Sequence, residues 1–168
     1  MNSRKNSSDL AEALRSLLVN TVLTAMLCIY TFSVLFGVTV QQGNSMSPAI
    51  KDGDIIVYYR RCDPYNGAAV VYERADNAIT GRIAAVPGAV ISETGDGTME
   101  IDGIMIENTV MHISGVPEGM SLPVSLGDNQ YYILNDDRAR ADDSRTYGGV
   151  EREKIKGCII AVLRRRAI

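Results

Sequence analysis

No charged residue occurs between residues 16 and 50 of this 168-residue chain. Within that stretch, residues 17–40 are apolar enough to cross a bilayer, which takes about 20 helical residues. The alternatives are a buried core helix and a cleaved signal peptide. A signal peptide has an apolar run of only about 7–15 residues before a small-residue cleavage site, whereas residues 38–42 read Val-Thr-Val-Gln-Gln. We therefore expect a retained transmembrane helix over residues 16–40.

Positive charges flank this stretch closely on its N-terminal side. Arg4, Lys5 and Arg15 precede it, and the next Lys or Arg is Lys51. Short flanks rich in Lys and Arg stay in the cytoplasm. We therefore expect a cytoplasmic tail over residues 1–15 and an extracytoplasmic domain over residues 41–168. The chain would then be a single-pass protein of the plasma membrane, with the lipid bilayer as a partner.

Short runs rich in Val, Ile and Tyr follow residue 50, with turn-forming residues between them. They cover residues 54–60, 68–73, 78–86, 89–94, 99–107 and 130–135. Many short strands at this spacing are typical of an all-β barrel or sandwich-like domain, and Asp102-Gly103 is a hairpin signal. The run of residues 158–168 is too short for a second span and predicts a last strand with a basic end. We expect no helix after residue 50, and so a mainly β domain.

Charge and cysteine content narrow the classes of function. The net charge is −3 and the basic residues are scattered, which argues against nucleic acid as a partner. The three cysteines have neither C-x-x-C nor metal-site spacing, and we expect no metal and no cofactor. Cys28 lies in the apolar run, which leaves Cys62 and Cys158 as the possible disulfide pair. Disulfide-bonded domains usually have an even number of cysteines. The odd number here favours unpaired thiols, although the sequence does not decide the matter.

Ser45 lies in the glycine-led stretch GNSMSPAI (residues 43–50), shortly after the apolar run. A serine hydroxyl is a poor nucleophile unless a neighbouring base takes its proton, and a lone serine in such a stretch is usually a turn residue. Three more motifs follow along the chain: NGAAVVYE (66–73), GRIAAVPGAV (81–90) and NDDRARADDSRTYGGV (135–150). In this order, behind one N-terminal anchor, the four motifs resemble those of type I signal peptidases of the Gram-positive type. The resemblance covers most of residues 17–163.

The resemblance implies a signal-peptidase-like antiparallel β domain behind one transmembrane helix. It also implies a serine endopeptidase that removes signal peptides from exported preproteins, after an Ala-x-Ala-like sequence, at the outer membrane face. Ser45 corresponds to the nucleophile and Pro48 to the motif's proline. The Ser45 N–H would be an oxyanion donor, and Gly43 would let the chain approach the substrate. Apolar residues near Met46 and Ile83 would form shallow pockets for small side chains.

The resemblance also carries over four charged positions that support the family's site: Arg82, Asp136, Asp143 and Arg145. The alternative for these residues is a set of surface ion pairs, which would contribute little to stability.

The sequence departs from the family where the base should be. The family's base is a neutral lysine at the first position of the third motif, and this chain has Gly81 there. Glycine offers no proton acceptor, and the guanidinium of the adjacent Arg82 stays protonated. The serine that in the family hydrogen-bonds the lysine falls at Ala141. His112 is an alternative base, but it lies in the irregular stretch of residues 107–129 rather than at the lysine position.

Three hypotheses stay open. The retention of Ser45 favours an active signal peptidase whose base the sequence does not reveal. Gly81 and Ala141 favour a catalytically inactive homologue, similar to lysine-free family members associated with the assembly of surface pilins. Soluble Ser-Lys autoproteases share the fold, but the predicted anchor argues against them. The expected partners are therefore preprotein signal peptides or pilin subunits.

Overall fold

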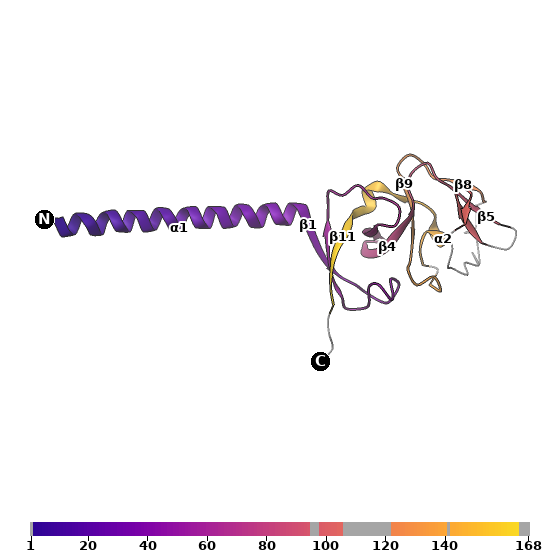
Figure 1. Cartoon of the computed structure of the whole chain (residues 1–168), viewed down its shortest axis with the longest axis horizontal. Coiled ribbons are helices and arrows are strands. Elements are labelled where there is room, and N and C mark those ends of the chain that lie inside the picture. Colours follow the sequence, from indigo (N-terminus) through magenta and orange to yellow (C-terminus); the bar gives the residue numbers. More distant parts are fainter. Residues whose placement is uncertain (1, 95–97, 106–121, 141, 165–168) are drawn as a thin grey trace. The chain divides into compact units, whose positions relative to one another are not determined.

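The computed structural model describes residues 2–94, 98–105, 122–140 and 142–164, with side-chain exposure described from residue 12 onward. The chain divides into two compact units, Met1–Phe36 and Gly37–Ile168. The first unit is built on one helix, α1 (Asn2–Leu35), and the second is built mainly from strands (Figure 1).

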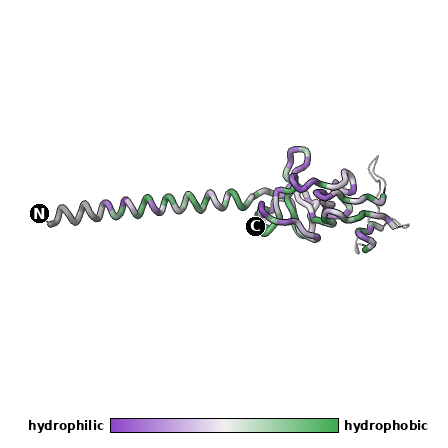
Figure 2. The backbone as a smooth tube through the Cα atoms, turned by 90° about the horizontal axis from the view of Figure 1, so that it is seen from above, coloured by the Kyte–Doolittle hydropathy of each residue, from purple (hydrophilic) through white to green (hydrophobic). Residues whose placement is uncertain are grey.

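Helix α1 contains a segment, Glu12–Leu35, that is long and apolar enough to cross a membrane. Figure 2 shows hydrophobic residues along much of this helix. The hydroxyls of Thr21, Thr24 and Thr31 donate to carbonyl groups four residues earlier at 2.7–2.8 Å, so they need no water as a partner. The helix is therefore chemically compatible with the hydrocarbon core of a bilayer.

The helix ends before the predicted membrane segment does. Residues 36–40 of that segment form strand β1 (Phe36–Val40) instead of a last helical turn. Their sequence, Phe-Gly-Val-Thr-Val, is rich in the β-branched and aromatic residues that suit a strand. The predicted helical boundary at residue 40 is corrected to Leu35.

The second unit contains a seven-stranded sheet with the order β1-β2-β11-β3-β4-β9-β10. The strands after β1 are β2 (Ile55–Tyr59), β3 (Ala69–Arg74), β4 (Asn77–Ala85), β9 (Gln130–Leu134), β10 (Val150–Glu151) and β11 (Ile155–Leu163). Strand β11 pairs antiparallel with both β2 and β3, and β4 pairs antiparallel with β3 and β9. The sheet therefore places β4, which carries Gly81 and Arg82, in its interior.

A smaller four-stranded sheet has the order β7-β6-β5-β8. Its strands are β5 (Val90–Glu93), β6 (Met99–Ile101), β7 (Ile104–Met105) and β8 (Val124–Ser125). The predicted hairpin is present between β6 and β7, where Asp102 and Gly103 both have positive φ angles, 52° and 75°. A tight two-residue hairpin turn requires positive φ at both central residues, and Asp-Gly adopts this conformation readily.

The predicted mainly β fold is confirmed, and each predicted strand region contains a strand. The expectation of no helix after residue 50 was wrong. A four-residue helix, α2 (Ser144–Tyr147), and a short 3₁₀ helix, η1 (Arg152–Lys154), occur there. Such short helices have too few residues for a helical period to be visible in the sequence. Asp143 caps α2 by accepting a hydrogen bond from the Arg145 backbone N–H.

Cys62 and Cys158 form a disulfide, with their Cα atoms 5.8 Å apart, contrary to the expectation of free thiols. Cys158 lies on β11 opposite Tyr59 of β2, and Cys62 follows β2 by three residues. The two cysteines are therefore brought together by the pairing of β2 with β11, two strands that are far apart in the chain. Cys28 of α1 has a free thiol.

Replacing Cys62 and Cys158 with alanine is expected to lower the free energy of unfolding by about 2–4 kcal/mol. The reason is that the bond joins residues 96 positions apart, and a long closed loop restricts the unfolded chain. Urea denaturation of the detergent-solubilised protein, followed by circular dichroism, measures the change. Cys28→Ala is the matched control and should leave the midpoint unchanged. Equal midpoints for the double variant and the control would contradict this prediction.

Candidate functional site

Ser45 lies in the segment that follows β1, and backbone hydrogen bonds fix its position. Gly43 has a φ angle of +74°, which a residue with a side chain rarely adopts. Its N–H donates to Asp52 Oδ1 at 2.6 Å. The carbonyl of Ser45 accepts a hydrogen bond from the Asp137 N–H at 2.9 Å. The segment is thereby tied to the loop after β9. Pro48, at its far end, is exposed.

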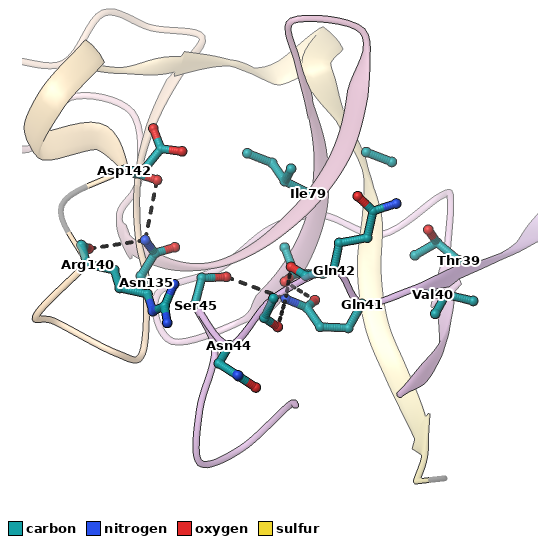
Figure 3. Close-up of a pocket in the computed structure, with 13 residues that line it drawn as sticks. Thr39, Val40, Gln41, Gln42, Asn44, Ser45, Ile79, Asn135, Arg140 and Asp142 are labelled. Carbon is teal, nitrogen blue, oxygen red and sulfur yellow. Dashed lines mark hydrogen bonds between the residues drawn. The ribbon is translucent and has the colours of Figure 1, made fainter. Parts of the chain in front are cut away.

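Gln41 connects Ser45 to strand β4. Its Nε2 donates to Ser45 Oγ at 3.4 Å, and its Oε1 accepts from Thr80 Oγ1 at 2.5 Å. Figure 3 shows the Gln41 side chain reaching toward Ser45. The oxygen that would attack a substrate is thus an acceptor for an amide N–H. Because a neutral amide cannot take up the serine proton, Gln41 is not a general base.

A pocket of about 350 Å³ opens beside Ser45. One wall is residues 39–45, a second is residues 78–80 of β4, and a third comes from Asn135, Arg140 and Asp142 (Figure 3). Neither lysine nor histidine lines it among the described residues. The one carboxylate in the lining, Asp142, is exposed and ion-paired with Arg74. The pocket therefore surrounds the Ser45 hydroxyl with neutral polar groups, such as those of Gln41 and Thr80, and with apolar side chains, such as Ile79.

Met46 and Ile83, near which shallow apolar pockets were expected, do not themselves line this pocket. Met46 is fully buried in a cluster with Ile50 and Ile56. Ile83 is 1% exposed and belongs to a second core cluster. Both side chains belong to the hydrophobic core, and the apolar residues that do line the pocket are Val40, Ala78 and Ile79.

The space that a side chain at Gly81 would enter is filled. Gly81 is buried on β4 and pairs with Val70 of β3. A Cβ atom on residue 81 would lie 2.4 Å from Ile133 Cγ2 and 3.1 Å from Tyr72 Cε1. The sequence predicted a vacant position, but neighbouring core side chains occupy the direction in which a base would project.

Tyr72 does not supply the missing proton acceptor. Its hydroxyl lies 2.7 Å from that of Tyr147. Burial is the main reason that the pKa of Tyr72 is raised above its usual value. Burial likewise raises the pKa of Tyr147 to about 12. Both phenols are therefore protonated at neutral pH and are poor bases there.

Two of the charged residues expected to support the site form a partly exposed pair. Arg82 donates from Nε and one terminal nitrogen to the two carboxylate oxygens of Asp136, both at 2.7 Å. Its other terminal nitrogen donates to the Gly67 carbonyl at 2.8 Å. The hydrogen bond that Arg82 donates to the Asp136 carboxylate raises the pKa of Arg82. This bidentate pair joins β4 to the loop that follows β9.

The other two charged residues expected to support the site, Asp143 and Arg145, form a buried ion pair. Their side chains are 0% and 5% exposed. Arg145 donates to both carboxylate oxygens of Asp143, at 2.8 and 2.7 Å. Its guanidinium also donates to the carbonyls of Arg138 and Arg140 at 2.9 and 2.6 Å. The alternative of a surface ion pair is thus excluded for these two residues. The pair holds the loop that supplies the third wall of the pocket. Ala141 and His112 lie outside the described residues.

The comparisons with known proteins agree with this arrangement. Residues 14–163 match the family model described as signal peptidase, peptidase S26. The chain belongs to the signal peptidase family. A probable signal peptidase I-2 from Synechocystis sp. is 30% identical over 126 residues, which is 68% of this chain and 56% of that protein. The chain thus matches little more than half of that relative's length.

A solved structure, a signal peptidase I from Enterococcus faecalis, is 19% identical to this homologue. The superposition covers 59% of this chain and 98% of that chain, with a TM-score of 0.44.

Sequence reasoning missed two residues at the site of this signal peptidase homologue, Gln41 and Thr80. Each is only 4% exposed, although its side chain is polar. Thr80 directly precedes Gly81, and Gln41 lies four residues before Ser45. Their positions next to two of the motifs were the one hint in the sequence that they belong to the site. No local sequence pattern predicts that these two side chains contact each other.

Proposed function

We propose that this signal peptidase homologue binds signal peptides of exported preproteins in the pocket beside Ser45 and does not hydrolyse them. The observation that carries the proposal is the filled space at Gly81, where Ile133 and Tyr72 would meet a side chain. Removing one member of a serine catalytic unit reduces turnover on the order of a million-fold. Without a base, the same pocket can still bind an extended chain.

The proposed location is the outer face of the plasma membrane, with Glu12–Leu35 as the anchor. The cytoplasmic tail is residues 1–15, and its positive charges favour this orientation. The disulfide between Cys62 and Cys158 supports it further, since disulfides persist mainly outside the reducing cytoplasm. In this location the domain would meet a preprotein as it emerges from the membrane.

Pilin subunits are a narrower class of partner for the same role. The resemblance to lysine-free members of the family suggests them, as exported proteins that carry signal sequences of their own. Binding without cleavage would suit a chaperone that holds such a subunit before assembly.

Hydrolysis is the second candidate function. The half-buried Ser45 side chain remains part of the pocket lining, and the family is one of peptidases. In this case the proton acceptor would come from residues other than those that line the pocket. The two candidates differ in one measurable step, the breaking of a peptide bond.

The test uses the full chain in detergent micelles with a fluorescent signal-peptide substrate. Binding is followed by fluorescence anisotropy and cleavage by mass spectrometry, with an active signal peptidase as the assay control. We expect saturable binding and no cleavage by the parent chain. Ser45→Ala and the matched control Ser47→Ala should bind within about tenfold of it, because at most one net hydrogen bond is lost.

Cleavage by the parent that disappears in Ser45→Ala, but persists in Ser47→Ala, would establish a peptidase and overturn the proposal. Failure of the parent to bind the peptide at any accessible concentration would overturn the binding role as well.

A further inference from the structure

Gln41 and Thr80 form a buried polar pair in the pocket beside Ser45. They come from different parts of the chain, Gln41 just after β1 and Thr80 on β4, and both line the pocket. The hydrogen bond from Thr80 Oγ1 to Gln41 Oε1 fixes the orientation of the amide. Because the Thr80 hydroxyl is the donor in this bond, it turns the amide nitrogen of Gln41 toward Ser45.

The amide nitrogen of Gln41 makes long hydrogen bonds that it can exchange for a shorter one to a ligand. Gln41 Nε2 has two hydrogens, and its three acceptors are the Gln42 carbonyl, the Gly43 carbonyl and Ser45 Oγ, at 3.2, 3.3 and 3.4 Å. All three distances exceed the usual 2.9–3.0 Å. In the part of the chain that the structure describes, Ser45 Oγ acts only as an acceptor. The Ser45 hydroxyl and the Gln41 amide are therefore two neighbouring donors.

The charged residues in the pocket lining are already paired. Arg140 is ion-paired with Asp137, and Asp142 with Arg74. A charged ligand group would therefore have to compete with these partners, whereas a neutral acceptor would not. Two adjacent neutral donors match one oxygen of a hydroxyl or an amide carbonyl.

A small apolar side chain is a poor match for the same place. A methyl group seated there would remove water from the two donors without replacing its hydrogen bonds, which costs about 1–3 kcal/mol for each buried group left unsatisfied. A serine, threonine or asparagine side chain supplies the acceptor instead.

We infer that the pocket selects a peptide residue with a neutral hydrogen-bonding side chain, in place of the alanine that the family resemblance implies. Gln41 and Thr80 are the specificity-determining residues. This inference rests on the proposed peptide binding and names the class of peptide that is bound.

The test compares signal peptides that differ at single positions. Each of the last three residues before the expected cleavage position is serine in one peptide and α-aminobutyrate, which has the same shape without the oxygen, in its partner. We expect the full chain to bind the serine peptide about 3- to 10-fold more tightly at one of these positions, the effect of one net hydrogen bond. Fluorescence anisotropy gives the dissociation constants.

The Gln41→Leu/Thr80→Val variant should lose this preference or reverse it. Thr94→Val is the matched control and should keep it, because Thr94 is also a partly buried, hydrogen-bonded threonine but lies outside the pocket lining. Thr80→Val alone preserves the shape of the side chain and gives a second variant if the double variant fails to fold. With the amide no longer oriented, Thr80→Val should also reduce the preference.

Equal affinity for the two peptides of every pair, or tighter binding of α-aminobutyrate by the parent chain, would overturn the inference and leave peptide binding intact. Failure of all peptides to bind would overturn the proposed function and the inference together. A preference that survives in both Gln41→Leu/Thr80→Val and Thr80→Val would assign the selection to other residues and also overturn the inference.

Discussion

Replacing Asp143 with alanine is expected to lower the free energy of unfolding by about 3–5 kcal/mol, the typical effect of leaving one member of a buried ion pair without its partner. The Asp143 carboxylate accepts hydrogen bonds from the Asn135 and Arg145 N–H groups at 3.0 and 3.1 Å, in addition to the bidentate bond from the Arg145 guanidinium. Without the carboxylate, a guanidinium that is 5% exposed keeps its charge with no counter-charge beside it.

Chemical denaturation of the detergent-solubilised chain measures this loss. Lys156→Ala is the matched control, because Lys156 pairs with Glu73 and both side chains are 39% exposed. We expect that variant to lose less than about 1 kcal/mol, as exposed pairs do. Similar losses for the two variants would show that the Asp143–Arg145 pair contributes no more than a surface pair.

Replacing Gly81 with lysine is expected to destabilise the fold by several kcal/mol and to give no cleavage. The new Cβ atom would lie 2.4 Å from Ile133 Cγ2, and overpacking of this kind costs about 1–3 kcal/mol. The lysine would also bring an ammonium group or its neutral amine into the core beside Tyr72, which adds a penalty for desolvation. We therefore do not expect the lysine alone to produce peptidase activity.

Ile133→Leu offers a way to make room, because leucine has nearly the same volume but no γ2 methyl group. Alone it should cost less than about 1.5 kcal/mol. Combined with Gly81→Lys, it should recover a measurable part of the stability that the single lysine variant loses. Thermal unfolding of the four chains, parent, two single variants and the double variant, gives this coupling directly. An unchanged unfolding midpoint for Gly81→Lys alone would show that the space beside residue 81 is open.

The parts of the fold that are coded locally could be predicted from the sequence. The uncharged stretch of residues 16–50 indicated a helix suited to a membrane, and the Val-, Ile- and Tyr-rich runs indicated strands. Asp102-Gly103 indicated a hairpin because its conformation is a property of two adjacent residues. Strand β1 was missed because Phe-Gly-Val-Thr-Val continues the apolar run without a visible break. The composition of residues 36–40 suits both a strand in a sheet and the last turn of a membrane helix.

The features that depend on distant residues could not be predicted. The Cys62–Cys158 bond follows from the pairing of β2 with β11. The burial of Met46 and Ile83 depends on which sheet face each residue meets, and the polar pair in the pocket depends on Gln41 reaching Thr80. The sequence shows a glycine at residue 81, but the side chains that fill its surroundings come from β3 and β9 and could not be predicted.

The place of β11 between β2 and β3 has a consequence for biosynthesis. Strands β2 and β3 lack their shared partner until residues 155–163 have been synthesised, so the strand edges that pair with β11 stay open during that time. Open edges are prone to pair with other chains, and such distant pairings form slowly. We expect the newly made domain to depend on folding helpers until β11 has been synthesised.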